Sequence, residues 1–398
     1  MTKQMQDAYI VAATRTPVGK APRGAFKHTR PDSLLAHVLK SVLAQVPAIE
    51  PNRIDDVIVG CAMPEYEQGM NVARIGVLLA GLPSTVAGMT INRFCSSGLN
   101  AVSIAADRIR TGEVDVMIAA GTESMSMIPM LGRLAMNADV FTRDENLGIA
   151  YGMGLTAEKV AAGWKVSREE QDAFALASHQ KALAAQANGE FKAEISPFPI
   201  RESVPDLSSG TVVVKSRNFE RDEGPRPDTS PESLAKLKPV FAAKGSVTAG
   251  NSSQTSDGAG AAILVSERTL NELNLTPLAR WVGFAVAGVP PEVMGIGPIA
   301  AIPKLLKSTG LAQDQIDWIE LNEAFAAQSL AVINELGLDP AKVNPLGGAI
   351  ALGHPLGATG AVRTATIVHG LRRRKQKYGM VTMCVGTGMG AAGIFEAV

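Results

Sequence analysis

The sequence is poor in cysteine, in aromatic residues and in net charge. It has three cysteines, Cys61, Cys95 and Cys384, and an odd number without close spacing argues against a disulfide framework and for a reducing compartment. Basic and acidic residues both number 38, so no global field favours nucleic acid or an anionic membrane. No CxxC or HExxH motif occurs, and the five histidines are scattered, which predicts that there is no metal site.

Long apolar runs are also missing. No segment reaches the length that a membrane span requires, so none is expected. The N-terminus lacks the apolar stretch of a signal peptide and the arginine and serine richness of a transit peptide. Together these absences predict a cytoplasmic location. The basic run at residues 372–375 favours the solvated C-terminal end of a helix over a binding patch, because positive charge suits that end.

What the chain does contain is typical of a well-buried α/β enzyme. Hydrophobic residues make up 46% of it, aromatic residues only 5%, and 39 residues are glycine. Its 398 residues exceed what one core usually serves, so two or three domains are expected. Apolar segments without alternation predict strands covered on both faces, at residues 8–13, 54–60, 114–121 and 261–266. Apolar stripes predict helices at residues 33–46 and about 323–336.

One pattern occurs twice along the chain. The matching segments are residues 54–62 and 316–324, 94–109 and 353–367, and 117–122 and 382–387. Aligning Gly98 with Gly357 places Cys95 opposite His354. A duplicated fold would bring the two loops together about a pseudo-twofold axis. The pair of a thiol and an imidazole is the makeup of a nucleophilic cysteine site.

The middle third, residues 125–255, interrupts this pattern, and we interpret it as an insertion into the first repeat. A capping box at residues 167–170 predicts the start of a helix within it. A polar stretch at residues 201–230 follows. A polar segment of this length is either a lid over a substrate or a tolerated surface insertion, and composition does not separate the two.

Cys95 is the candidate nucleophile. It precedes an alanine-rich helix, whose N-terminus contributes roughly 0.3–1 kcal/mol toward a thiolate. Lowering a thiol pKa from about 8.5 to 7 needs about 2 kcal/mol, so a base must take the proton, and His354 in its glycine-rich segment is the candidate. The alternative is a buried cysteine that only packs, and the repeat alignment favours the nucleophile.

Two further residues are candidates. Cys384 ends a buried strand before a glycine-rich turn at residues 385–390, whose backbone N–H groups would point into a site near this second thiol. Too little chain follows for the helix of a dinucleotide-binding motif, so that interpretation is rejected. Asn322 follows a strand, where α/β folds place their sites, and a helix N-cap is the equal alternative. Cys61 is interpreted as a core residue.

These segments together resemble the thiolase family over essentially the whole chain. The matching stretches, in order, are residues 92–101, 248–259, 322–326, 347–361 and 384–390. The resemblance implies an α/β thiolase fold of two duplicated βαβαβαββ halves in a five-layer αβαβα arrangement with an inserted loop domain. It implies an N-terminal half of residues 1–124 and 256–274, a coenzyme A-binding loop domain of residues 125–255, and a C-terminal half of residues 275–398.

The resemblance also assigns catalytic roles. Cys95 would take the acyl group, His354 would activate it, and Cys384 would be the general acid and base for the acetyl carbanion. Asn322, through a water, and His354 would form one oxyanion hole, and the backbone N–H groups of Cys95 and Gly386 the other. Two holes make physical sense, because charge develops first on the ketone oxygen and then on the departing enolate.

Coenzyme A contacts follow from the same resemblance. Arg226 would lie near the nucleotide end and Ser253 on the pantetheine arm. Apolar residues would line the tunnel, with core packing as the alternative for the methionine and the phenylalanines; they are Met153, Phe241, Ala249 and Phe325. No cofactor is bound permanently, because coenzyme A and acyl-CoA are substrates.

The implied activity is that of an acyltransferase, a 3-ketoacyl-CoA thiolase of fatty acid β-oxidation and lipid metabolism. Short-chain biosynthetic members carry a histidine where this chain has Gly152, which favours longer substrates over the alternative, acetyl-CoA acetyltransferase. A non-catalytic acyl- or lipid-binding relative would lack a reactive group that this chain retains. The expected assembly is a homodimer or homotetramer, and a hydratase/dehydrogenase subunit of β-oxidation is a further candidate partner.

Overall fold

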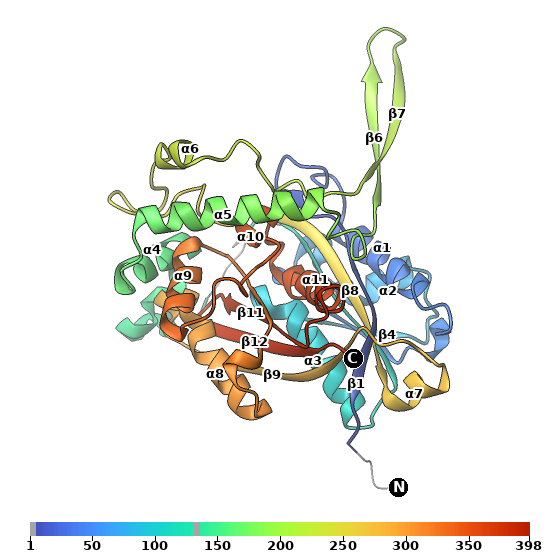
Figure 1. Cartoon of the computed structure of the whole chain (residues 1–398). Coiled ribbons are helices and arrows are strands. Elements are labelled where there is room, and N and C mark those ends of the chain that lie inside the picture. Colours follow the sequence, from blue (N-terminus) through green and yellow to red (C-terminus); the bar gives the residue numbers. More distant parts are fainter. Residues whose placement is uncertain (1–4, 131–135) are drawn as a thin grey trace.

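The computed structural model describes residues 5–130 and 136–398, and one long path of paired strands runs through it (Figure 1). The strand order is β10-β11-β12-β9-β1-β8-β5-β3-β4, and β2 pairs with β8. The order is nearly symmetrical about β1 and β9. The strands are β1 (Ala8–Arg15), β2 (Gly19–Lys20), β3 (Asp56–Gly60), β4 (Ala87–Ile91), β5 (Val116–Ser124), β8 (Ser256–Ser266), β9 (Ala279–Gly288), β10 (Trp318–Leu321), β11 (Tyr378–Val385) and β12 (Met389–Glu396).

The two halves of this path have the same pairing directions. β3 and β5 are parallel, and so are β10 and β11. β8 runs antiparallel to β5 and β1, just as β12 runs antiparallel to β11 and β9. The halves join where β1 and β9 pair antiparallel, with Ile10 opposite Ala279. The duplicated α/β fold predicted from the repeat is therefore confirmed.

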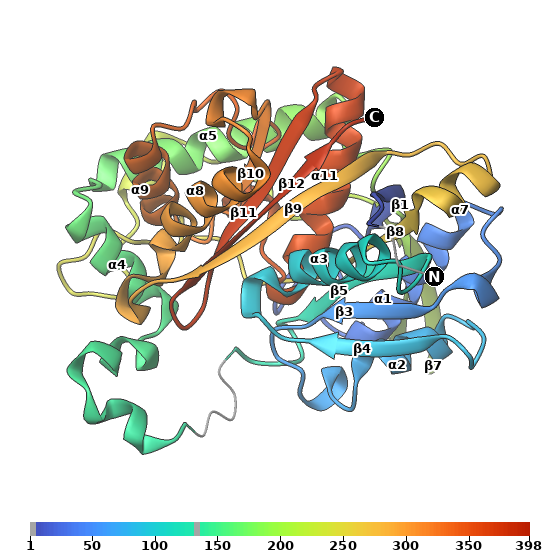
Figure 2. The ribbon, with the colours of Figure 1, turned by 90° about the horizontal axis from the view of Figure 1, so that it is seen from below.

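Two helices, α3 (Ser97–Arg110) and α11 (Thr359–Arg374), form the central layer. They pack on each other, and each contacts strands of both halves: α3 contacts β5 and β9, and α11 contacts β8 and β11. Figure 2 shows α3 between β9 and β5. Their buried apolar side chains join one core cluster, which includes Leu99, Val102, Ile367 and Leu371.

Further helices cover the outer face of each half. α1 (Pro31–Ala44) and α2 (Val72–Leu79) pack on the N-terminal half, and α8 (Gly297–Thr309) and α9 (Ala326–Leu336) on the C-terminal half, each pair over its own apolar cluster. Pro31 suits the first turn of α1 because its φ is already helical and its missing N–H is not needed there. With the central pair this makes the predicted αβαβα layers, and the predicted helices differ from α1 and α9 only by two or three residues at their ends.

Glycines allow the N-termini of α3 and α11 to meet. A Cβ atom built on Gly98 would lie 2.9 Å from the carbonyl oxygen of Gly357 and 2.6 Å from the backbone nitrogen of Ala361. A Cβ atom built on Gly360 would lie 2.0 Å from the backbone nitrogen of Leu99. No side chain fits at these separations, so the two backbones touch directly. The two glycines equated by the repeat alignment thus face each other between the halves.

The middle third of the chain lies between β5 and β8. It contains α4 (Met153–Gly163), α5 (Arg168–Ala187), α6 (Pro231–Ala235) and the strands β6 (Phe198–Asp206) and β7 (Thr211–Phe219). The predicted capping box is confirmed, because Ser167 Oγ accepts from the Glu170 backbone and the Glu170 carboxylate accepts from the Ser167 backbone. The polar stretch at 201–230 contains most of a β6–β7 hairpin that projects from the body (Figure 1).

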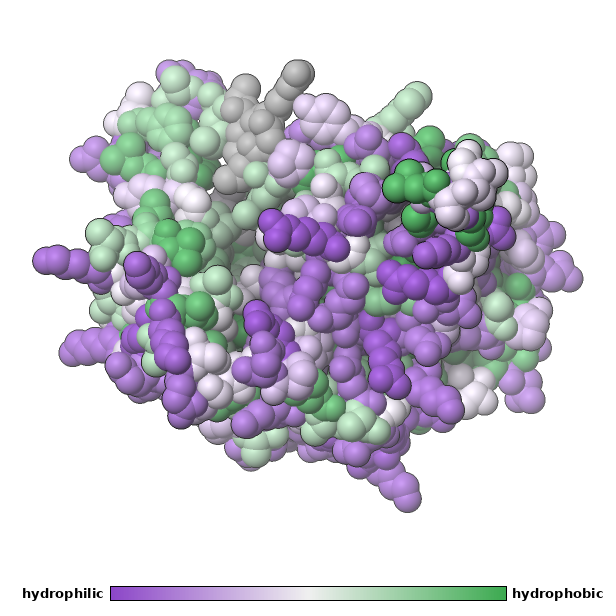
Figure 3. Space-filling model, turned by 90° about the horizontal axis from the view of Figure 1, so that it is seen from above, coloured by the Kyte–Doolittle hydropathy of each residue, from purple (hydrophilic) through white to green (hydrophobic). Residues whose placement is uncertain are grey.

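The surface is mostly hydrophilic on the face seen in Figure 3, with smaller apolar groups among the polar side chains. The basic run at 372–375 ends α11 as predicted, and Arg373 pairs with Glu190 at 2.5 Å. Within residues 5–130 and 136–398, no helix combines the length and the apolar character that crossing a membrane requires.

The contact between the central helices can be tested by substitution. Gly98→Ala is expected to lower the free energy of unfolding by about 1–3 kcal/mol, because the added methyl group overpacks the contact with Ala361. Gly163→Ala is the matched control, since an added Cβ there meets nothing within 4 Å and alanine is the better helix former. Chemical denaturation of both variants measures the difference, and equal stability of the two would contradict the close packing.

Candidate active site

Cys95 lies in a 3₁₀ turn, Phe94–Ser96, that leads directly into α3. Side chains of the same segment hold this turn. The backbone nitrogen of Phe94 donates to Asn92 Oδ1 at 2.8 Å, and that of Arg93 donates to Ser97 Oγ at 2.8 Å. Phe94 has a φ of 43°, a left-handed conformation that is uncommon for a residue with a side chain. Cys95 is thus at a helix N-terminus, as predicted.

The surroundings of Cys95 keep its thiol protonated. Burial raises the pKa of Cys95 to about 12, and hydrogen bonds from the backbone of Gly386 and of Cys95 itself act in the opposite direction. The apolar residues that pack nearby are Ala62, Met63, Ile128 and Leu356. Because the resting group is a neutral thiol, any nucleophilic reaction needs a base to take its proton.

His354 is 4% exposed, and both of its ring nitrogens face polar side chains. Its backbone nitrogen donates to Ser256 Oγ at 3.1 Å, its Nδ1 lies 2.7 Å from Thr359 Oγ1, and its Nε2 lies 3.3 Å from Asn322 Nδ2. An amide nitrogen can only donate, so Nε2 accepts and Nδ1 carries the hydrogen. Burial lowers the pKa of His354 to about 3, and the positive charge of Arg363 lowers it as well. The imidazole is therefore neutral, with a lone pair at Nε2.

Cys384 lies near the end of β11 and is 1% exposed. Its thiol donates to Gln328 Oε1 at 3.9 Å. Burial raises the pKa of Cys384 well above its ordinary range, and repulsion from a Cys95 thiolate raises it further. The end of this strand packs against the turn that carries Cys95, because a Cβ atom built on Gly386 would lie 3.5 Å from the ring of Phe94.

Segments from both halves meet at this site. The turn Phe94–Ser96 contacts β11 and the 3₁₀ turn Leu356–Ala358, which follows His354. The structure therefore brings together the segments that carry Cys95, His354 and Cys384. The side chains of these segments are thiols, an imidazole and amides. In the part of the chain that the structure describes, no three His, Cys, Asp or Glu side chains are grouped so that they could hold a metal ion.

Asn322 belongs to the same site. It is 2% exposed, directly follows β10, and reaches His354 through its amide nitrogen. The alternative role of helix N-cap is wrong, because α9 begins at Ala326 and its N-cap is Phe325. The amide oxygen Oδ1 is buried and has no hydrogen-bond partner among the described residues. A buried, unpaired acceptor of this kind is costly unless a ligand or a water satisfies it.

Apolar residues predicted to line a tunnel lie beside Cys384. Met153 and Phe325 pack in the same cluster as this thiol. Phe241 meets Phe325 edge-on, with ring centroids 6.1 Å apart. The backbone nitrogen of Ser253 donates to the carbonyl of Ala324 at 2.9 Å, so this serine adjoins the same cluster. Four of the residues predicted to contact coenzyme A thus lie in or beside the cluster that contains the Cys384 thiol.

The remaining two residues lie further out. Arg226 is exposed and pairs with Asp228 at 3.0 Å, and its backbone nitrogen donates to Nδ1 of His179 on α5 at 3.2 Å. Ala249 is exposed on the segment that leads from the inserted elements to β8. Their exposure suits the far parts of a long ligand rather than the reacting atoms, because both thiols are more deeply placed.

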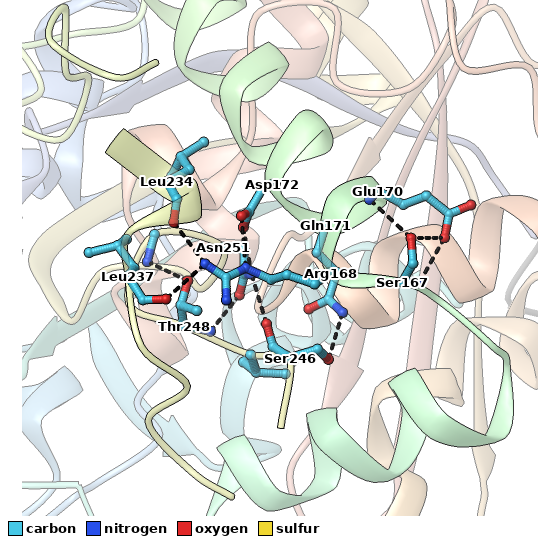
Figure 4. A network of polar contacts seen from close by, with 12 residues as sticks. Ser167, Arg168, Glu170, Gln171, Asp172, Leu234, Leu237, Ser246, Thr248 and Asn251 are labelled. Carbon is cyan, nitrogen blue, oxygen red and sulfur yellow. Dashed lines mark hydrogen bonds and ion pairs between the residues drawn. The ribbon is translucent and has the colours of Figure 1, made fainter. Parts of the chain in front are cut away.

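Polar contacts fix that connecting segment against α5 (Figure 4). Asn251 Nδ2 donates to Asp172 at 2.9 Å, and Asn251 Oδ1 accepts from the backbone of Thr248 at 2.8 Å. Arg168 pairs with Asp172 at 2.7 Å and also donates to the carbonyl of Leu234 at 2.7 Å. The backbone near Ala249 is therefore held by buried and half-buried hydrogen bonds rather than by apolar packing alone.

Two residues near the reactive groups were not found from the sequence. Gln328 occupies the third position of α9, where a side chain turns back to the helix start, and it accepts from the backbone of Phe325 at 3.3 Å. This spacing was an available signal. Thr359 is the first residue of α11, and only the folded loop shows that its hydroxyl faces His354.

Comparison with known families follows the two halves of the chain. The family model described as "Thiolase, N-terminal domain" matches residues 8–268, and that described as "Thiolase, C-terminal domain" matches residues 275–397. The chain belongs to the thiolase family. The predicted family, fold and enzyme class, an acyltransferase, are therefore confirmed.

Individual relatives agree with this assignment. The chain is 50% identical over 393 residues to a protein of Bacillus subtilis (strain 168) named 3-ketoacyl-CoA thiolase, covering 98% of this chain and 100% of that one. A crystal structure of the Bacillus anthracis acetyl-CoA acetyltransferase superposes with a TM-score of 0.90 at 41% identity, covering all of both chains. The dimeric peroxisomal thiolase of Saccharomyces cerevisiae gives 0.87 at 42% identity, covering 99% of this chain and 98% of that one.

The contact between His354 and Thr359 gives a prediction. Thr359→Val is expected to lower kcat in a thiolase assay about tenfold to a hundredfold, because Nδ1 of the imidazole loses the hydrogen-bond partner that holds the ring in its orientation. Thr359→Ser keeps a hydroxyl and serves as the control, with turnover near that of the wild type. Wild-type kcat in Thr359→Val would contradict this role.

Proposed function

We propose that this chain is a 3-ketoacyl-CoA thiolase, which cleaves a 3-ketoacyl-CoA with coenzyme A in a reversible ping-pong reaction. The observation that carries the proposal is the setting of Cys95. The turn that carries it contacts the strand that carries Cys384 and the turn that follows His354, so segments of both halves of the chain surround this thiol. The name of the Bacillus subtilis relative supports the same activity.

In the first half-reaction, the Cys95 sulfur attacks the 3-keto carbon while its proton passes to Nε2 of His354. The bond between C2 and C3 then breaks, its electron pair goes to C2, and Cys384 donates a proton to that carbon. Acetyl-CoA leaves, and the shortened acyl group stays on Cys95 as a thioester. These reaction steps require a neutral imidazole and two neutral thiols at the start, which agrees with the lowered pKa of His354 and the raised pKa values of Cys95 and Cys384.

In the second half-reaction, the Cys384 thiolate takes the proton of the coenzyme A thiol, whose sulfur attacks the acyl carbon. The bond to Cys95 breaks, and His354 returns its proton to that sulfur. The ketone oxygen would be stabilised in one oxyanion hole by the backbone N–H groups of Cys95 and Gly386, because these adjoin the sulfur that bonds to the ketone carbon. The thioester oxygen of the departing enolate would be stabilised in the other by His354 and, through a water, by Asn322.

Coenzyme A would lie along the inserted segment. Arg226 would meet its charged nucleotide end, Ser253 and Ala249 its pantetheine arm, and the apolar cluster of Met153, Phe241 and Phe325 the part nearest the thiols. Residues 125–255 would then act as a coenzyme A-binding loop domain, with residues 1–124 and 256–274 as one half and 275–398 as the other. The edge-on packing of Phe241 on Phe325 supports this path.

We also propose an assembly, a pathway and a location for this protein. We infer a homodimer, which the dimeric Saccharomyces cerevisiae relative supports, or a homotetramer built from two dimers. A role in fatty acid β-oxidation, including docking on a hydratase/dehydrogenase subunit, follows from the proposed substrate. The cytoplasm is the proposed location, in line with the bacterial relative, whereas the yeast relative is described as peroxisomal.

The covalent step gives the first test. Incubation with a 3-ketoacyl-CoA and no free coenzyme A is expected to add the mass of the shortened acyl group to Cys95, as measured on the digested protein by mass spectrometry. Cys95→Ser is expected to lose about a thousandfold or more in kcat, because it removes the activated nucleophile. Cys61→Ser, at a buried position outside the proposed chemistry, is the control. An unmodified Cys95 with activity intact in Cys95→Ser would refute the proposal.

Chain length separates the two candidate activities. The similarity to an acetyl-CoA acetyltransferase keeps the condensation of two acetyl-CoA as the second candidate. Because Gly152 carries no side chain, and an added Cβ there would meet nothing within 4 Å, we expect kcat/KM to be at least tenfold higher for a C8 3-ketoacyl-CoA than for acetoacetyl-CoA. Gly152→His should lower the ratio of kcat/KM for the C8 substrate to kcat/KM for acetoacetyl-CoA. The reverse preference would favour the acetyltransferase.

A further inference from the structure

Glu123 is a buried carboxylate beside the proposed site that the reaction above does not use. It lies near the end of β5 and is 1% exposed. One oxygen accepts from the backbone nitrogens of Ala62 and Gly357, both at 2.8 Å. The other accepts from Gln68 Nε2 at 2.6 Å and from the Cys61 thiol at 3.9 Å. Donors surround both oxygens, which is the environment of an ionised carboxylate.

These contacts join the two halves of the molecule. Ala62 follows β3 in the N-terminal half, whereas Gly357 belongs to the loop of the C-terminal half, three residues after His354. The two backbones approach so closely that a Cβ atom on Gly357 would lie 2.5 Å from the nitrogen of Ala62. One carboxylate oxygen thus holds both N–H groups at the point where the loops touch.

The same two segments form the walls around the proposed nucleophile. Ala62 and Leu356 both belong to the apolar cluster that packs against Cys95. Leu356 is the neighbour of Gly357, and its backbone nitrogen donates to the carbonyl of His354 at 2.9 Å. A shift of the loop away from Glu123 would therefore move His354 relative to Cys95.

We propose that Glu123 is a positioning residue, which holds the His354 loop against the Cys95 loop across the junction of the two halves. The proposal rests on the proposed function, because it assigns the base to His354 and the nucleophile to Cys95. Glu123 itself touches neither reacting atom. It acts by fixing where the imidazole lies, and small displacements of a catalytic group are costly to turnover.

An electrostatic role and a positioning role of Glu123 predict opposite effects on the reactivity of Cys95 when the charge of Glu123 is removed. Burial is the main reason that the pKa of Cys95 is high, and the negative charge of Glu123 raises it further. Removing only the charge would therefore favour the thiolate and speed its reaction. Removing the tie between the loops would slow it. The sign of the change thus separates a positioning role from an electrostatic one.

The test is Glu123→Gln, which keeps the shape but leaves one oxygen for three strong donors. We expect kcat to fall about a hundredfold with KM changed less than about threefold, since Glu123 contacts no residue of the proposed coenzyme A path. Alkylation of Cys95 by iodoacetamide should slow as well. Val116→Ala at the start of β5 is the control for lost stability, with kcat near that of the wild type. Faster alkylation, or unchanged kcat, would overturn the proposal.

A double-mutant cycle shows whether Glu123 acts through His354. In the His354→Ala background, Glu123→Gln should reduce the remaining turnover by less than about threefold, because the group that it positions is gone. A full hundredfold further loss would overturn the proposal. Should Glu123→Gln not fold, Glu123→Asp serves instead: it keeps the charge and shortens the reach, so an active enzyme with wild-type kcat would count against positioning. Activity retained by Cys95→Ser would instead refute the proposed function, whatever Glu123 does.

Discussion

The direct backbone contact between the N-termini of α3 and α11 is the constraint on which the rest of the structure depends. Gly98 and Gly360 leave no room for a side chain, so the two central helices meet end against end and each continues into the core between the halves. The loops before these helices carry Cys95 and His354. Because both loops are anchored to helices that cannot separate without exposing that core, the halves must assemble before the site exists.

Buried carboxylates also hold the loops that the glycine contacts bring together. Glu123 ties the His354 loop to the N-terminal half. Glu323, next to Asn322, accepts from Ser178 Oγ at 2.6 Å and from the backbone of Ile350 at 3.2 Å, and so ties the glycine-rich segment to α5. A glycine-rich backbone loses much entropy when it is ordered, and these charge-assisted hydrogen bonds help to offset that cost. The glycine-rich segment therefore adopts one backbone conformation, because acidic side chains on other elements hydrogen-bond to it.

The same burial sets the chemistry of the site. It raises the pKa of both thiols and lowers that of His354, so the resting site holds neutral groups. Separating charge in such apolar surroundings costs free energy. Hydrogen-bond donors that already point at the charged atom reduce this cost, and the backbone of Gly386 is such a donor for Cys95. Proton transfers that accompany bond making avoid that cost, since no isolated ion has to persist in the apolar surroundings.

The amino-acid sequence by itself determined the repeat, the apolar strands, the capping box before α5 and the equivalence of Gly98 and Gly357, because each follows from spacing along the chain. It did not reveal the hairpin β6–β7, whose residues are mostly exposed and therefore carry no regular burial pattern. The sequence did not decide whether Asn322 is a site residue or a helix N-cap. Only the tertiary structure decided that Asn322 meets His354, that Thr359 orients the imidazole and that Glu123 joins the halves. Such contacts link residues that no spacing relates, since they arise from how separate elements pack.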